Sequence, residues 1–175
     1  MLEACHERVE RSLALLERLQ RHVQTHGCDL QARQAATDVL RYFDMAAPLH
    51  HQDEELHVFP ALLSGADAIV AQVASTLIAQ HRQMEPLWAA MRVALSAIVA
   101  TDTAPPTQTV PSECLPDRMV KEFCEVYREH IQLEERIAYP HAKDLMDSEN
   151  LQCMGEDMMQ RRGVKLVVPL KASTH

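Results

Sequence analysis

Two copies of one pattern dominate the sequence: HHQDEELHVFP at residues 50–60 and HIQLEERIAYP at residues 130–140. Both read His-x3-Glu-Glu-x3-aromatic-Pro. Residues four apart in an α-helix share one face, so His50 with Glu54, and His130 with Glu134, each present an imidazole beside a carboxylate. A single pair of this kind is common as a solvated ion pair. Two copies with matching flanks indicate two bidentate arms for a metal.

Helical periodicity extends outward from both copies. Gly27 ends the first apolar pattern as a C-terminal glycine does. Pro48 is expected to kink the second helix, because proline removes a backbone donor and crowds the preceding turn. The Pro- and Thr-rich stretch 101–113 is predicted to be a loop. Long helices are predicted at about residues 2–26, 30–63, 67–100 and 113–146.

These helices predict an all-α fold, an up-down-up-down four-helix bundle with a short C-terminal helical extension. A length of 175 residues suits one compact domain. The bundle is assigned to residues 2–146. Residues 147–175 are assigned to the extension, with a short helix that ends near Gly163 and a weakly structured tail.

The heights of four histidines in such a bundle provide a separate test, because each helical residue adds about 1.5 Å along the axis. His6 and His50 are both 22 residues from the first predicted turn. From the second turn, His50 is 15 residues away and His81 is 16. Counting across the longer loop brings His130 within one residue of the level of His81. Each helix therefore brings one histidine to a common level.

Glu54 and Glu134 complete a set of four imidazoles and two carboxylates inside the predicted bundle. Such side chains on facing helices build dinuclear iron or manganese sites. Without metal, two carboxylates buried together would repel each other, and two divalent cations remove that conflict. Imidazole with carboxylate favours iron, with manganese or zinc as lesser candidates, and the lack of thiolates argues against a structural zinc site.

These features make the chain resemble the hemerythrin-like family, also called the HHE cation-binding domain, over roughly residues 2–146. The resemblance rests on His6 in CHERVE, the two repeated segments, and His81 in AQHRQ, in that order. It implies a four-helix bundle around two non-haem iron ions, oxo- or hydroxo-bridged when oxidised. It also implies a ligand set of terminal imidazoles and bridging carboxylates: His6, His50, His81 and His130 with Glu54 and Glu134.

The chain departs from the oxygen-carrying hemerythrins at two places. Those proteins have two histidines at HxxxH spacing in the third helix, where this chain has His81 and Glu85. Their last-helix carboxylate lies one residue further from its histidine, at the place of Glu135. Reversible oxygen carriage is therefore not expected. Glu85 is left open as a seventh ligand, a partner of a ligand, or an exposed residue.

Neighbouring residues are assigned lesser roles. His51 and Glu55 point about 100° away from the first His-Glu pair and are expected at the bundle surface or just outside the ligands. Tyr127 is expected either to face the metal pocket or to pack in the core. Phe59 and Tyr139 are expected to pack at the ends of the site, without a direct functional role. Three further histidines are set aside as ligands because of their height: His22, His26 and His57.

Composition narrows the partners and the compartment. With 17 basic and 25 acidic residues, the net charge is −8, which argues against nucleic acid or an anionic membrane as a partner. No apolar run approaches the roughly 20 residues that span a bilayer. The N-terminal stretch is predicted to be an amphipathic helix and not a secretory signal. Five scattered cysteines without a CxxC pair are typical of reduced thiols in a cytoplasmic protein.

Six protein ligands and a bridging oxygen cannot saturate two six-coordinate irons, so the resemblance implies an open position. The leading hypothesis is a protein that binds O2, NO or peroxide there, for sensing, detoxification or iron handling. The alternative is an iron store or metal-responsive regulatory bundle without gas chemistry, and a third hypothesis is a bundle with a vestigial site. Nothing indicates an organic substrate pocket, so a metal- and gas-binding protein is favoured over a dedicated enzyme. The sequence assigns no protein partner.

Overall fold

The computed structural model describes residues 2–101 and 114–164, and all regular structure in this part is helical. Residues 102–113, which hold most of the predicted loop, and residues 165–175 of the predicted tail lie outside the described residues. The α-helices are α1 (Leu2–His26), α2 (Leu30–Arg41), α3 (Ala47–Asp53), α4 (Phe59–Ser64), α5 (Ala68–Ala100), α6 (Asp117–Leu133), α7 (Tyr139–Leu145) and α8 (Ser148–Arg161). The π-helical segments are η1 (Tyr42–Ala46), η2 (Glu54–Val58) and η4 (Glu134–Ala138).

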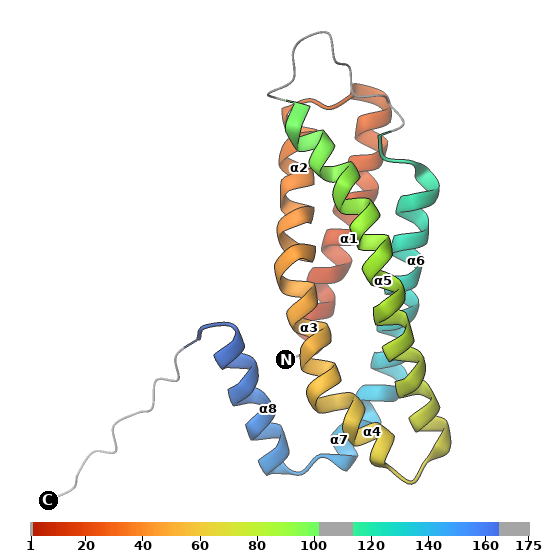
Figure 1. Ribbon diagram of the computed structural model, residues 1–175, viewed down its shortest axis with the longest axis vertical. Helices are drawn as coiled ribbons and strands as arrows, with labels where there is room; N and C mark the ends of the chain where they lie inside the picture. The colour runs from red at the N-terminus through yellow and green to blue at the C-terminus, as the bar shows by residue number, and fades with distance from the viewer. Residues whose placement is uncertain (1, 102–113, 165–175) are drawn as a thin grey trace, which may run out of the picture.

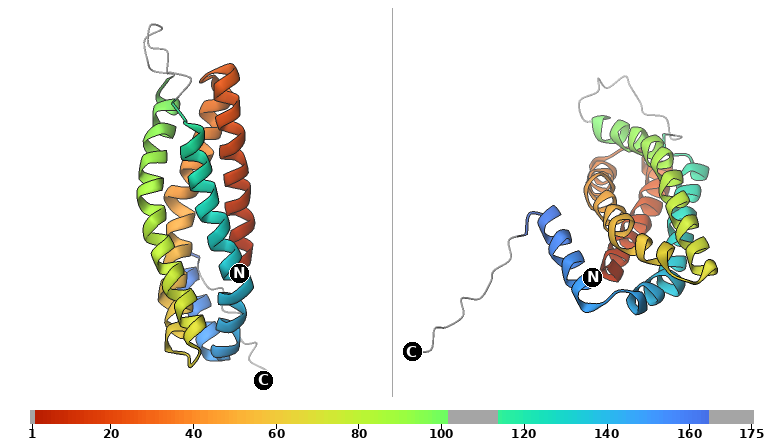
Figure 2. Two further views of the ribbon diagram at one scale, coloured as in Figure 1. Left: turned by 90° about the vertical axis from the view of Figure 1, so that its right-hand side faces the viewer. Right: turned by 60° about the horizontal axis from the view of Figure 1, so that its bottom comes forward.

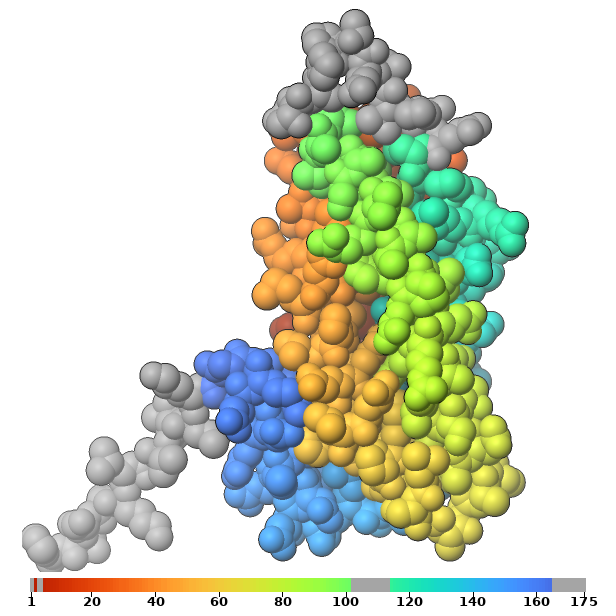
Figure 3. Space-filling model, viewed as in Figure 1, coloured from red at the N-terminus to blue at the C-terminus, as the bar shows by residue number. Residues whose placement is uncertain are grey.

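The long helices form an all-α bundle, as the sequence predicts. Helix α1 packs against α2 and α6, and α5 packs against the same two helices. The long helices therefore close into a ring, which is seen along its length in Figure 1 and from two further directions in Figure 2. Helix α8 lies outside this ring and packs against α3 (Figures 1 and 3).

The prolines do not break the helices that contain them. The segment predicted as one helix with a kink runs continuously through α2, η1, α3, η2 and α4. Pro48, Pro60 and Pro140 each take the second position of the α-helix that follows a π-helical segment. The wider π-helical turn leaves room for the proline ring, which would otherwise crowd the carbonyl one turn earlier. Two of these π-helical segments begin at Glu54 and Glu134, the glutamates of the repeated His-x3-Glu pairs.

Helix ends follow the sequence signals with one correction. Gly27 has a φ of 77° and ends α1, as expected. Asp29 and Asp67 accept hydrogen bonds from backbone N–H groups in the first turns of α2 and α5. Helix α6 begins at Asp117, later than the predicted start near residue 113, because the extended backbone of Pro116 precedes it.

The apolar core is divided by a polar layer. One cluster fills the bundle around Leu13, Phe43 and Phe123, and another lies around Leu62 and Leu77. Along each long helical segment, a buried histidine lies between residues of the two clusters. None of the described helices is long and apolar enough to cross a membrane.

Candidate metal centre

Six buried histidine and glutamate side chains meet in the polar layer, and they are the six residues that the sequence selects as ligands. They form two overlapping groups of four, and within each group one potential ligand atom per residue lies within 4.8 Å of the others. The groups are His6, His50, Glu54 and Glu134, and Glu54, His81, His130 and Glu134. Because both glutamates belong to both groups, the arrangement can hold two cations bridged by two carboxylates.

Glu54 lies between imidazoles from two helical segments. Its Oε1 is 3.3 Å from Nε2 of His50, and its Oε2 is 3.4 Å from Nε2 of His81. The hydroxyl of Tyr139 donates a hydrogen bond to Oε1 of Glu54 and lies 3.1 Å from Nε2 of His6. Glu54 therefore contacts three other segments of the chain at the centre of the bundle.

Glu134 occupies the equivalent place in the second copy of the pattern. Its Oε1 is 3.0 Å from Nε2 of His130, and its Oε2 is 3.1 Å from Nε2 of His6. Burial raises the pKa of this carboxyl, but the close contacts with the imidazoles of His130 and His6 outweigh burial and hold the pKa at about 2. Glu134 is therefore an anion in the absence of metal.

Several polar atoms of the centre are buried without a hydrogen-bond partner among the described residues. They are Nδ1 of His50, Oε2 of Glu54 and both carboxylate oxygens of Glu134. Imidazole nitrogens lie 3.0–3.4 Å from these oxygens, yet the angles are not those of hydrogen bonds. Buried anionic oxygens without partners are costly, and a divalent cation would satisfy them. The residues present therefore fit a metal.

Acceptors at the rim of the centre orient three of its imidazoles. A hydrogen bond at Nδ1 turns Nε2 towards the carboxylates, which is how outer residues position metal-binding histidines. These Nδ1 contacts join His6 to Glu135 at 2.9 Å, His81 to Glu55 at 2.8 Å and His130 to Gln80 at 3.0 Å. The sequence did not indicate Gln80, because one glutamine on a helix carries no specific signal.

The imidazoles differ in their readiness to take a proton. Burial alone lowers the pKa of His6, but its close contact with Glu134 and its hydrogen bond with Glu135 outweigh burial, so its pKa is raised. For His50, burial dominates and the pKa is lowered. His50 is therefore the more readily neutral of the two, which is the form that binds a metal.

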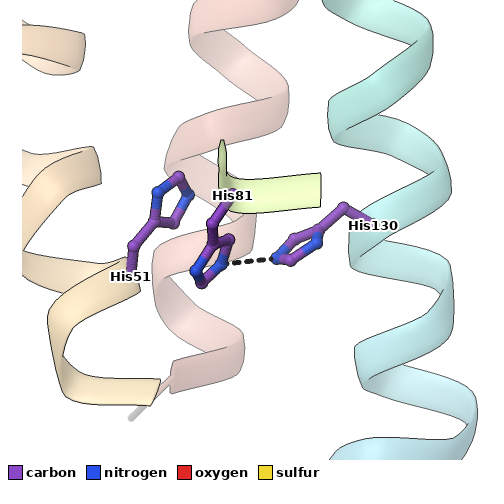
Figure 4. A group of neighbouring side chains, drawn as sticks. All are labelled: His51, His81 and His130. Atoms are coloured by element: carbon purple, nitrogen blue, oxygen red, sulfur yellow. Dashed lines mark hydrogen bonds between the residues drawn. The ribbon is translucent and has the colours of Figure 1, made fainter. Parts of the chain in front are cut away.

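His51 lies just outside the proposed ligands, which is one of the two positions expected for it, the other being the bundle surface. Its ring stacks on that of His81 with 3.9 Å between centroids. Figure 4 shows His51, His81 and His130 reaching the same region from α3, α5 and α6, and these histidines form a further group that could hold a metal. Burial keeps the pKa of His51 well below its usual range.

Tyr139 has contacts that the sequence analysis did not expect. It was predicted to pack without a direct functional role, but its hydroxyl bonds both His6 and Glu54. In a regular α-helix, the fifth residue after Glu134 points roughly 140° away from it. The π-helical segment η4 separates the two residues and turns Tyr139 back to the same face. The aromatic-Pro ending shared by both copies was the available signal.

The remaining histidines and Glu85 lie outside the two groups of four. Glu85 is exposed and lines a cavity together with Tyr127, which also packs in the core. His22 pairs with Asp29 at 3.0 Å, and His57 pairs with Asp157 on α8 at 2.9 Å.

Asp53, the residue before Glu54, is a third buried carboxylate, and the sequence did not indicate it. Its side chain is fully buried and bonds two arginines of the C-terminal region. Arg161 approaches it at 2.7 Å and Arg162 at 2.6 Å. Leu133 holds the equivalent position in the second copy, and this difference between the copies was the only signal.

A helical bundle with imidazoles and carboxylates converging from its facing helices defines a class of metal-binding proteins. The sequence matches the hemerythrin HHE cation-binding domain over residues 1–142, and the chain belongs to this family. It is also 30% identical over 165 residues to an uncharacterized protein of Haemophilus influenzae, an alignment that covers 94% of this chain and 90% of that protein.

Proposed function

We propose that this chain is a non-haem di-iron protein that binds O2, NO or peroxide at an open iron position, and that it serves sensing, detoxification or iron handling. One observation carries the proposal: two groups of four buried ligands share Glu54 and Glu134. The proposed terminal ligands are His6, His50, His81 and His130.

Iron is proposed over manganese or zinc because imidazole with carboxylate suits it and because no thiolate belongs to the set. Bound iron would supply electrons and Lewis acidity to a small ligand. The chain contributes a site shielded from bulk water, a hydrogen-bond donor at Oε1 of Glu54 from Tyr139, and fixed imidazole orientations. Six protein ligands leave room for a small molecule.

The proposal includes the organisation expected from the sequence. Residues 2–146 form an up-down-up-down bundle of the hemerythrin-like type, and residues 147–175 form an extension that begins with α8. The cytoplasm is the proposed location, because the five cysteines are scattered and include no CxxC pair. Neither nucleic acid nor membrane is a proposed partner, because the net charge is −8.

The test is the metal content and visible spectrum of the purified protein, recorded when oxidised, after anaerobic reduction, and after exposure to O2 or NO. We expect about two irons per chain and charge-transfer bands that change with the gas. One zinc, or no metal after expression in iron-rich medium, would contradict the proposal.

A second candidate is an iron store or metal-responsive regulatory bundle without gas chemistry. The unpartnered carboxylate oxygens favour it, because a cation that satisfies them stabilises the folded state whatever its redox chemistry. Two irons per chain, a large rise in melting temperature and a spectrum insensitive to O2 and NO would select this function over the first.

A further inference from the structure

The two copies of the pattern surround the centre with matching contacts and two informative differences. Glu55 bonds Nδ1 of His81, and its counterpart Glu135 bonds Nδ1 of His6. The copies differ next to the metal ligands: His51 corresponds to Ile131, and Phe59 corresponds to Tyr139. The two halves of the centre therefore have the same ligands but different surroundings.

In the half that holds His6 and His50, a surface groove reaches His6, but Tyr139 covers the ligand atoms. The phenol ring stacks on His6 with 5.4 Å between centroids, and its hydroxyl bonds both His6 and Glu54. The position opposite, in the other half, has Phe59, which has no hydroxyl and packs near His81 at 5.4 Å between centroids. A phenol bonded to two ligands occupies space that an incoming molecule would need.

The half that holds His81 and His130 adjoins a cavity of about 240 Å³. His81 is part of the cavity wall, so the cavity reaches a proposed ligand directly. A water molecule occupies about 30 Å³ in the liquid, so the cavity has room for a ligand of two or three atoms together with water. Other residues of the wall include His51, Gln52, Glu85, Trp88 and Tyr127.

The wall changes in character from the outside inwards. Gln52 and Glu85 are exposed at the mouth, whereas His51 and Tyr127 lie deeper. A neutral imidazole has one N–H donor and one acceptor nitrogen, so His51 can bond a polar ligand of either kind. Its ring already lies against His81, as Figure 4 shows.

From these contacts we infer that small ligands of two or three atoms reach the centre mainly from the His81 side, through this cavity, and that His51 hydrogen-bonds the ligand beside His81. The inference rests on the proposed metal centre and adds to it the half that takes the ligand. Azide is a suitable probe because it has three atoms and accepts hydrogen bonds at both ends.

The test uses the iron-loaded full chain, with azide association followed by stopped-flow absorption and expressed per bound iron. The repeat offers a matched pair of substitutions, because Gln52 and Gln132 hold the same position in the two copies and both are exposed. Gln52 lines the cavity, while Gln132 lines the surface groove on the His6 side. We expect Gln52→Trp to slow azide association by about tenfold or more and Gln132→Trp to leave it within about twofold.

The role of His51 is tested by azide release. His51→Leu removes both ring nitrogens, and loss of one hydrogen bond to the ligand should weaken azide binding by about fivefold, mainly through faster release. Ile131→Leu, at the equivalent position, is the control and should bind azide as the wild type does. Azide binding by His51→Leu that equals the wild type would refute the role of His51, whatever the two tryptophan variants show.

The outcomes separate this inference from the proposed function. Wild-type protein without two metals per chain contradicts the proposed dinuclear centre. If the wild-type protein holds two metals, three results contradict only the inference. The wild type takes up no azide, Gln132→Trp slows azide association as much as Gln52→Trp does, or neither variant slows it.

Discussion

At the scale of single residues, Glu54 and Glu134 determine the charge of the centre. Both side chains are fully buried, and both belong to each group of potential ligands. Contacts with His130 and His6 outweigh burial and keep the pKa of Glu134 at about 2, so its charge persists in the metal-free protein. A carboxylate that stays ionised and buried attracts a cation more strongly than one that takes up a proton.

Removing either glutamate should therefore prevent two metals from binding together. We expect Glu54→Ala and Glu134→Ala each to abolish the dinuclear spectrum, because each glutamate belongs to both groups. Metal analysis and visible absorption of the purified variants measure this. His22→Ala is the control, since His22 pairs with Asp29 away from the centre and its loss should leave the spectrum intact. Equal loss in all three variants would contradict the assignment.

Tyr139→Phe tests whether the phenol supports the centre. The substitution removes the donor to Glu54 and creates at this position the ring that the first copy has at Phe59. We expect the free energy of unfolding of the metal-free protein to fall by about 1–3 kcal/mol, because a buried carboxylate loses a hydrogen bond. Urea unfolding measures the change. Tyr42→Phe is the comparison, because the Tyr42 hydroxyl donates to the backbone of Cys5 over a longer 3.4 Å and should cost less.

The six converging residues could be selected from the sequence, because their positions follow from spacing within one helix or from the number of residues to the nearest turn. The repeated pairs depend on helical spacing, and the level of His6 and His81 depends on counting from turns. Tyr139 could not be placed in this way, because one π-helical segment shifts the face of every residue after it. Asp53 could not be paired, because its partners lie 108 and 109 residues away on a separate helix.

At the scale of elements, α8 is joined through ion pairs to the helical segment that carries His50 and Glu54. Arg161 bonds Asp53 and also Asp157 of its own helix, and Arg162 bonds the other oxygen of Asp53. Asp53 directly precedes Glu54, so the contacts with α8 lie next to a carboxylate of the candidate metal centre. Figure 3 shows α8 lying against this part of the bundle.

Neutralising both arginines should leave Asp53 as a buried charge without a partner. We expect Arg161→Met combined with Arg162→Met to lower the free energy of unfolding by about 3 kcal/mol or more. The reason is that removing the cations of a buried ion pair leaves the carboxylate of Asp53 buried without a partner. Adding Asp53→Leu should recover most of this loss, since Leu133 occupies the equivalent position in the second copy. Chemical denaturation of the three proteins gives the comparison. The same cost with and without Asp53→Leu would show that the arginines act elsewhere.

The pairing of α8 with η2 should also depend on pH. A hydrogen bond with His57, helped by the charge of Arg161, lowers the pKa of Asp157 below its ordinary value of 3.8. A lowered pKa in the folded state means that this contact stabilises α8 above about pH 4 and is lost as the pH falls through the lowered value. The protection of α8 amides, measured as the exchange rate relative to the intrinsic rate at each pH, should therefore fall on acidification below pH 4. Asp157→Asn should remove this part of the pH dependence, and an unchanged dependence in the variant would contradict the assignment.

Helix positions were predictable to within a few residues, and their internal irregularities were not. Apolar periodicity and Gly27 located α1, and apolar periodicity located α5. Pro48 suggested a kink, but the structure accommodates the proline with a π-helical segment instead. Apolar periodicity indicates which face of a helix is buried, but it does not indicate where a turn of that helix contains one extra residue.

At the scale of the whole molecule, the polar layer separates the two apolar clusters and interrupts the core. Each long helical segment contributes a buried histidine to this layer, so the layer connects the segments with one another. In the metal-free protein, the layer holds carboxylate oxygens without hydrogen-bond partners, which opposes folding. A metal that binds there acts on the stability of the entire bundle.

Metal loading should therefore raise the melting temperature of the whole chain in one cooperative step. A ligand at 1,000 times its dissociation constant raises the free energy of unfolding by about 4 kcal/mol. Each kcal/mol raises the melting temperature of a domain of this size by roughly 2–4 °C, so we expect a rise of about 10 °C. Calorimetry before and after iron loading, and again after chelation, measures it. Glu134→Ala should lose most of the rise, because both groups of ligands share this carboxylate. A rise of equal size in Glu134→Ala would mean that the stabilising metal binds outside the polar layer, and the link between the centre and the stability of the bundle would then be wrong.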